Sequence, residues 1–128
     1  MSYIKHKSEE SVEDYLENIL ILGKRLSNVR SIDIANEMSF SKPSVSVAMK
    51  NLRNNQYIQV SQEGFITLTE SGRKIAESVY EKHTLLTDWL VFLGVNTETA
   101  NADACKMEHD ISQESFEAIK KHIQSMLS

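Results

Sequence analysis

The chain has 128 residues, of which 41% are hydrophobic and 25% charged, with four glycines, one proline and one cysteine. This length fits one domain or two small ones. No apolar run reaches the ~18 residues of a membrane span, the N-terminus lacks an apolar signal core, and a single cysteine excludes an internal disulfide. Few glycines and prolines disfavour loop-rich folds. We therefore expect a mainly α-helical, cytoplasmic protein without a membrane partner.

The net charge of −4 is unevenly distributed along the chain. Residues 24–53 contain six basic and two acidic residues, so this block carries +4 and the rest of the chain −8. A basic block inside an acidic chain is typical of a surface that binds DNA.

Periodicity and capping residues predict the elements in chain order. Apolar residues recur at helical spacing from Val12, so we expect a helix over 11–26 with Ser11 as its N-cap. Two shorter helices should cover 31–38 and 42–54, the second with Pro43 in its first turn. The β-prone runs 57–60 and 65–68 then predict a hairpin.

Three more helices are expected to complete the chain. The first should run from a cap at Thr69 to a stop at Gly94, the second over about 97–109, and the third from a cap at Ser112. Their predicted core stripes are Ile75, Val79, Leu86, Leu90 and Leu93 on the first, and Phe116, Ile119, Ile123 and Met126 on the last.

Residues 31–50 have the pattern of a helix-turn-helix, with a tight turn at 39–41 and Ala35 where the two helices cross. Taken alone, this pattern also fits an ordinary αα-corner with a solvated face. The hairpin that follows favours a winged helix-turn-helix, whose second helix reads the major groove. The predicted contacts with double-stranded operator DNA are Ser41, Lys42, Pro43, Ser44, Ser46, Val47 and Lys50, with Gln62 at the tip of the wing.

A second set of residues combines metal-ligand types on otherwise apolar helices. Asp14 and Glu17 share one helix face. Another face carries Cys105, Glu108 and His109 at spacing i, i+3 and i+4, and His83 lies within the stripe of the long helix. A mixture of oxygen, nitrogen and sulfur ligands suits a divalent transition metal, whereas Mg²⁺ or Ca²⁺ prefers oxygen alone.

Each ligand candidate also has a plain structural interpretation. Asp14 and Glu17 fit a solvated face, His83 a hydrogen-bonded core histidine, and Cys105 a small buried apolar residue. Only the three ligand types on one turn of helix are specific. No protease, phosphate-loop or nucleophile-elbow motif is present, so we do not expect an enzyme or a small organic substrate.

The long helix carries more apolar residues than one stripe requires. The run consists of Leu85, Leu86, Trp89, Leu90, Phe92 and Leu93. We interpret its surplus face, together with the final helices, as a homodimer interface. The alternative is that Trp89 simply fills the core of the C-terminal half.

Several short segments together resemble the diphtheria toxin repressor family of metal-dependent transcription regulators, especially its short, manganese-transport-regulator branch. They are S-V-E-D-Y-L-E at 11–17, S-x-D-I-A at 31–35, K-P-S-V-S at 42–46, L-T-E-S-G at 68–72, K-H-x-L-L at 82–86 and C-K-M-E-H-D-I-S at 105–112. The resemblance implies a winged helix-turn-helix domain over 1–72 and a helical metal-binding and dimerisation domain over 73–128. The implied metal ligands are Asp14, Glu17, His83, Cys105, Glu108 and His109.

In the manganese branch, Cys105 corresponds to a carboxylate, whereas the iron-responsive branch has a cysteine there. A thiolate is softer than a carboxylate, which shifts the preference of the site from Mn²⁺ toward Fe²⁺, Co²⁺, Ni²⁺ or Zn²⁺. The expected ion is Fe²⁺ or Mn²⁺, and Co²⁺, Ni²⁺ or Zn²⁺ are expected to bind in vitro. The expected function is a homodimeric repressor that binds operator DNA when loaded with metal and controls metal-uptake genes. The alternative is a winged-helix regulator that responds to a signal other than metal.

Overall fold

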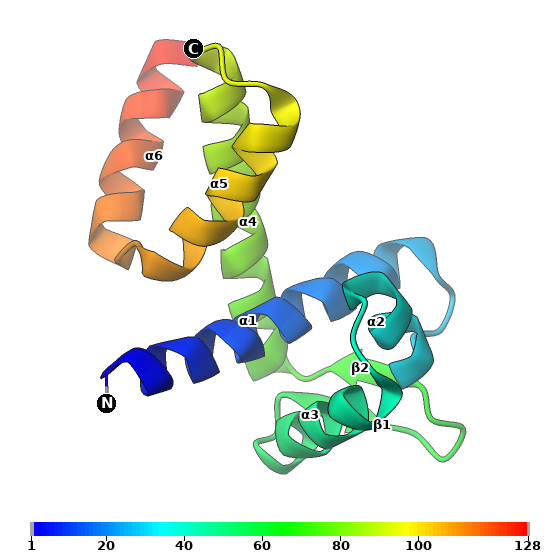
Figure 1. Ribbon diagram of the computed structural model, residues 1–128. Helices are drawn as coiled ribbons and strands as arrows, with labels where there is room; N and C mark the ends of the chain where they lie inside the picture. The colour runs from blue at the N-terminus through cyan, green and yellow to red at the C-terminus, as the bar shows by residue number, and fades with distance from the viewer. Residues whose placement is uncertain (1, 128) are drawn as a thin grey trace. The chain divides into compact units, whose positions relative to one another are not determined.

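A computed structural model describes the backbone of residues 2–127 and the side chains of residues 11–126. The described elements are α1 (Ser2–Arg25), α2 (Ser31–Met38), α3 (Lys42–Asn54), β1 (Ile58–Val60), β2 (Ile66–Leu68), α4 (Glu70–Phe92), α5 (Thr97–Asp110) and α6 (Gln113–Leu127) (Figure 1). The mainly α-helical prediction is confirmed. The chain divides into a first unit, residues 1–77, and a second unit, residues 78–128, with α4 crossing the boundary.

The prediction for the start of the first helix is wrong. α1 begins at Ser2, so Ser11 lies inside the helix and is not its N-cap. The apolar residues at helical spacing begin at Val12, and such spacing does not show where a helix starts. Residues 2–10 contain no glycine or proline that would interrupt the helix, which therefore continues to Ser2.

The helix-turn-helix has the predicted bounds. Ser41 caps α3, because its Oγ accepts a hydrogen bond from the Ser44 backbone N–H at 3.3 Å, and Pro43 occupies the first turn. The turn reverses at Ser39, whose φ of 57° is left-handed. Ile34 and Val45 are fully buried between the helices.

The turn also carries an aromatic contact. Phe40 stays 49% exposed and packs in a T-shaped arrangement against Tyr15 of α1. Burial raises the pKa of the Tyr15 hydroxyl.

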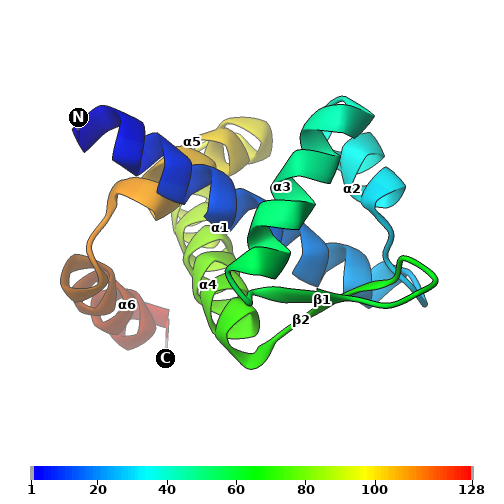
Figure 2. The same cartoon turned by 90° about the horizontal axis from the view of Figure 1, so that it is seen from below.

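The hairpin is antiparallel and pairs Ile58 with Leu68 and Val60 with Ile66. Its turn is closed by the Ser61 N–H, which donates to the Phe65 carbonyl at 3.0 Å. The Ile66 N–H donates to the Val29 carbonyl at 2.7 Å, which fastens the wing to the segment before α2. Figure 2 shows α2 and α3 next to each other with the hairpin below them.

The core of the first unit draws on every one of its elements. Its buried members are Leu16, Ile19, Leu22, Val29, Ile34, Ala35, Val45, Met49, Leu52, Ile58, Ile66 and Ala76. This continuous core fixes α3 and the hairpin as one rigid surface.

The predicted limits of α4 are confirmed. Thr69 caps it, since its Oγ1 accepts from the Gly72 N–H at 3.2 Å. Gly72 lies so close to the hairpin that a Cβ there would stand 2.0 Å from the Tyr57 carbonyl oxygen. Gly94, with a φ of +102°, ends the helix.

The second unit consists of the rest of α4 with α5 and α6. Asn96 caps α5, and Ser112 caps α6 as predicted. Its buried apolar residues are Val79, Leu86, Ala100, Ala104, Phe116 and Ile123. Leu93 and Met126 were expected on core stripes, but they are 57% and 48% exposed. Both lie near the ends of their helices, where the apolar spacing continues beyond the last residues that are buried against neighbouring helices. None of the described helices is long and apolar enough to cross a membrane.

Candidate metal centre and nucleic-acid interface

One turn of α5 brings three different ligand types together in the second unit. Cys105, Glu108 and His109 each offer one ligand atom, and these atoms lie within 4.8 Å of one another. The spacing i, i+3 and i+4 places them on one helix face. This convergence is the one that the sequence predicted.

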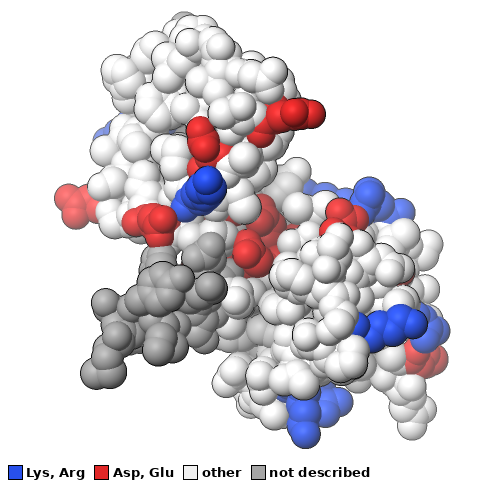
Figure 3. Space-filling view, viewed as in Figure 1, with Lys and Arg blue, Asp and Glu red and all other residues white. Residues whose placement is uncertain are grey.

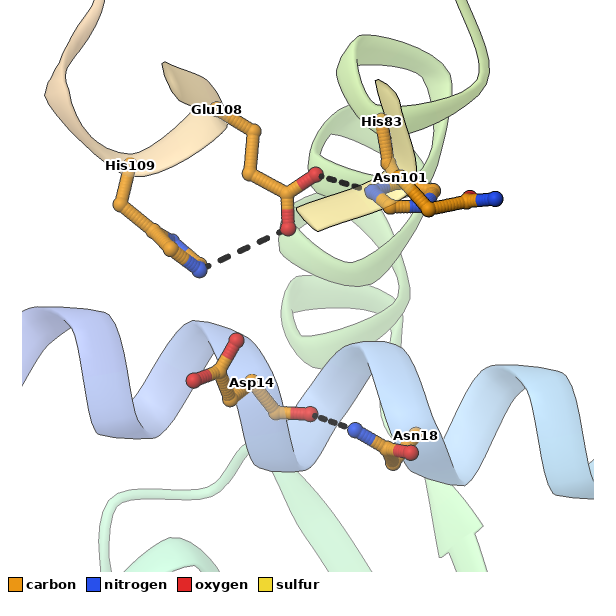
Figure 4. A network of polar contacts seen from close by, with 6 residues as sticks. All are labelled: Asp14, Asn18, His83, Asn101, Glu108 and His109. Carbon is orange, nitrogen blue, oxygen red and sulfur yellow. Dashed lines mark hydrogen bonds and ion pairs between the residues drawn. The ribbon is translucent and has the colours of Figure 1, made fainter. Parts of the chain in front are cut away.

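His83 on α4 joins this cluster through Glu108. Its Nδ1 lies 3.0 Å from Glu108 Oε2, while His109 Nε2 lies 3.5 Å from Glu108 Oε1 (Figure 4). The carboxylate of Glu108 therefore lies between two imidazole rings, one from each of two helices.

The burial of Glu108 supplies the test of whether these residues fit a cation. Glu108 is only 2% exposed, and its Oε1 accepts no hydrogen bond from any described residue. Burying a carboxylate oxygen without a hydrogen-bond partner is costly, and the cost falls when a cation is present beside it. Carboxylate, imidazole and thiol groups are the donors that divalent transition metals accept. The residues therefore fit such an ion.

The plain interpretations of the second-unit residues do not match their surroundings. Cys105 is exposed and so does not fill the core. The His83 side chain is 26% exposed and contacts a carboxylate, unlike a core histidine.

The acidic pair of α1 belongs to the first unit. Asp14 is half-buried, and its backbone carbonyl accepts a hydrogen bond from Asn18 Nδ2 at 2.8 Å (Figure 4). Glu17 is only 6% exposed. A solvated face therefore describes neither residue fully, and Glu17 least of all.

The predicted DNA-contacting residues all lie on the surface of the first unit. Every one of the eight, from Ser41 to Gln62, is exposed, and Val47 has 62% of its surface accessible. The N-terminus of α3 presents the Ser41 hydroxyl, which donates to Ser44 Oγ at 2.8 Å. The face is therefore rich in hydroxyl groups, which suit phosphate oxygens.

Basic side chains extend this face beyond the predicted residues. Arg53 lines the same hollow between α3 and the hairpin as Ser46 and Lys50. Arg30 stacks over the ring of Phe65 in the wing at 4.6 Å. Figure 3 shows Lys and Arg side chains spread over the first unit. The three-residue spacing from Lys50 was the signal that could have added Arg53 to the predicted set.

Two family patterns match this chain in succession. Residues 8–64 match the N-terminal DNA-binding domain of iron-dependent repressors, and residues 69–126 match the metal-binding and dimerisation domain of the same repressors. The chain belongs to the iron-dependent repressor family. The resemblance found in the sequence is therefore confirmed, and so is a winged DNA-binding part followed by a helical part.

Relatives of this chain include transcriptional regulators. The transcriptional regulator MntR of Salmonella typhimurium is 35% identical over 109 residues, covering 85% of this chain and 69% of its own. MntR of Geobacillus thermodenitrificans is 32% identical over 114 residues, which cover 89% of this chain and 81% of its own.

Solved structures of iron-dependent repressor relatives share the fold. The manganese regulator SloR superposes with a TM-score of 0.78 at 30% identity, covering 88% of this chain and 53% of its own. The metal-dependent regulator MtsR gives 0.82 at 26% identity, with coverage of 88% and 53%. This chain thus spans about half the length of these solved relatives.

Proposed function

We propose that this family member is a metal-activated repressor that binds operator DNA as a homodimer when loaded with Fe²⁺ or Mn²⁺ and controls metal-uptake genes in the cytoplasm. The observation that carries the proposal is the buried Glu108 carboxylate between His83 and His109, with one oxygen lacking a hydrogen bond. The same chain also has the exposed second helix of a helix-turn-helix, α3, which we call the recognition helix. We assign DNA binding to residues 1–72, metal binding and dimerisation to residues 73–128, and no catalytic role.

The proposed ligand set adds the acidic pair of α1 to the second-unit cluster. It consists of Asp14, Glu17, His83, Cys105, Glu108 and His109. When they bind metal, the three carboxylates and the thiolate carry about four negative charges, which repel one another if they are held together without a cation. A bound divalent ion supplies compensating positive charge.

This repulsion gives a physical route from metal to DNA. Without compensation, α1 is expected to separate from the α5 ligands, and the helix-turn-helix that packs on α1 would move with it. With compensation, the spacing of the two recognition helices in a dimer would be restricted, so that both reach successive major grooves. By linkage, DNA must tighten metal binding by the same factor.

An exposed apolar surface of the second unit supports the homodimer. Val91, Phe92, Leu93 and Met126 are all more than 40% exposed. Phe92 and Met126 also line a small hollow of about 80 Å³, whose other apolar lining residues are Leu85, Trp89 and Ile123. An aromatic residue on one copy could enter such a hollow on the other, which fits a self-complementary two-fold interface.

DNA-binding titrations of the full chain test this function. Fluorescence anisotropy on a palindromic operator should show tighter binding with Mn²⁺ or Fe²⁺ than with chelator. His109→Ala should lose this metal response, whereas His122→Ala, on an exposed position of α6, should keep it. DNA binding that is unaffected by chelator would contradict the proposal and favour a regulator of another signal.

The identity of the ion is tested at Cys105. Anaerobic competition between metals should show that Cys105→Glu shifts preference away from Zn²⁺ and Co²⁺ toward Mn²⁺, since a carboxylate is harder than a thiolate. Equal preference in both proteins would show that Cys105 does not set selectivity.

A further inference from the structure

Both ring nitrogens of His83 lie within hydrogen-bond distance of side chains of α5. Its Nδ1 lies 3.0 Å from Glu108 Oε2, and its Nε2 lies 3.2 Å from the amide oxygen of Asn101 (Figure 4). Asn101 and Glu108 are seven residues apart, or two helical turns, so they face α4 from the same side. Asn101 is not among the metal ligands that the sequence predicts.

A third contact fixes which end of the Asn101 amide faces the imidazole. The Asn101 Nδ2 group donates to the Thr97 backbone carbonyl at 3.1 Å. A carbonyl only accepts, so the amide nitrogen must point to it and the amide oxygen to His83. Because that oxygen also only accepts, Nε2 of His83 carries the proton in this contact.

The protonation of Nε2 determines what the other nitrogen can do. In the neutral ring, Nδ1 then carries a lone pair, and it lies beside a carboxylate oxygen that is also an acceptor. Two acceptors at 3.0 Å attract each other only when a proton or another cation lies between them. The pair formed by His83 Nδ1 and Glu108 Oε2 is thus shaped for a cation.

We propose that Asn101 is the positioning residue of the metal centre: it fixes the tautomer and ring orientation of His83 so that Nδ1 faces the ion together with Glu108. The proposal rests on the proposed function for the existence of the metal site. Histidines that bind metal generally donate their second ring N–H to such an acceptor, and losing the acceptor costs 10–100-fold in affinity or activity.

The test compares three variants of the full chain by anaerobic Co²⁺ titration. Asn101→Ala should bind Co²⁺ about 10–100-fold more weakly. Asn101→Asp keeps an acceptor oxygen and should bind at least as tightly as the wild type. Asp103→Ala is the matched control, because Asp103 is exposed on the same helix and its replacement gives a similar gain in helix propensity. Its affinity should not change.

A spectroscopic measurement separates orientation from a merely structural role. In ¹⁵N-histidine NMR spectra of the Zn²⁺-loaded protein, the wild type should show the His83 ring protonated at Nε2 and slow to exchange with water. Asn101→Ala should show faster exchange or a second tautomer. An unchanged ring signal with unchanged Co²⁺ affinity would overturn the assignment, as would an Asn101→Asp variant that binds as weakly as Asn101→Ala.

The result is distinguishable from failure of the proposed function. If Asn101→Ala keeps wild-type Co²⁺ affinity and its DNA binding still responds to metal, only the positioning role is lost. If Asn101→Ala loses Co²⁺ affinity but metal has no effect on DNA binding in the wild type, the repressor mechanism fails while the positioning role stands.

Discussion

The two units of this chain differ in how completely they bury apolar residues and satisfy polar groups. The first unit has a continuous apolar core, and its turns are closed by its own hydrogen bonds, as at Ser41 and Thr69. Among the described residues, the second unit buries fewer apolar side chains than the first, and it leaves Phe92 and Leu93 more than half exposed. Each unit also buries one carboxylate, Glu17 in the first and Glu108 in the second. The first unit thus stabilises itself and offers a surface to DNA. The second has a buried carboxylate oxygen that accepts no hydrogen bond from the residues that the structure describes, and an exposed apolar surface, which a cation and a second copy would stabilise.

The largest effect on stability should come from the contact between α4 and the hairpin. Gly72→Ala places a Cβ 2.0 Å from the Tyr57 carbonyl oxygen, so the backbone must shift, and we expect a loss of about 2–4 kcal/mol in the free energy of unfolding. Urea denaturation of the wild type and of Gly72→Ala measures this loss.

Gly23→Ala is the matched control for Gly72→Ala. Apart from its chain neighbours and the adjacent backbone of α1, no described atom lies within 4 Å of a Cβ at Gly23, so alanine should stabilise that helix by up to about 1 kcal/mol. Equal stability of the two variants would contradict the close packing of α4 on the wing.

The next largest effect should fall on association of the second unit. Phe92→Glu introduces a charge into the exposed apolar surface and should weaken the dimer by about 2 kcal/mol or more. Sedimentation velocity over a concentration series measures the shift toward monomer. Val47→Glu, on the exposed face of α3, should weaken DNA binding and leave the dimer intact. A dimer of unchanged strength in Phe92→Glu would place the interface elsewhere.

A smaller effect should separate capping from DNA contact in α3. Ser41→Ala removes the acceptor of the Ser44 N–H and should cost about 1 kcal/mol in stability. Ser46→Ala removes an exposed hydroxyl from the same face and should change stability by a few tenths of a kcal/mol at most. If thermal unfolding shows the same loss for both, Ser41 does not act as a cap.

The smallest effect should come from the ion pair between α4 and α6. Lys120 Nζ donates to Glu81 Oε2 at 2.9 Å, and this hydrogen bond raises the pKa of Lys120. Because the folded pKa is raised, the stabilisation is fully present below lysine's ordinary pKa and is lost as the pH rises past the folded pKa.

The Tm difference between wild type and Lys120→Met should therefore be small at neutral pH and should disappear in strongly alkaline buffer. It should also shrink in high salt, because the pair is partly exposed. A Tm difference that grows as the pH becomes alkaline would show that it does not come from the Lys120–Glu81 ion pair.

Much of this protein follows from local signals. Ser41 with Pro43, Thr69 and Gly94 fixed helix limits that the structure reproduces, because capping depends on neighbouring residues alone. The turn of α5 with Cys105, Glu108 and His109 could be predicted for the same reason. The start of α1 could not, since nothing in residues 2–10 indicates where a helix would end.

Burial and contacts between helices required the tertiary structure. Apolar spacing placed Leu93 and Met126 in the core, but spacing does not show how far a neighbouring helix extends. The roles of Glu108 and Asn101 depend on where α4 places His83, and residues 18 and 25 positions apart carry no local signal of contact. The sequence by itself determined the order of the elements and the types of ligand. Only the folded chain decided that the central carboxylate is buried and that an amide holds the histidine beside it, because both depend on packing between helices.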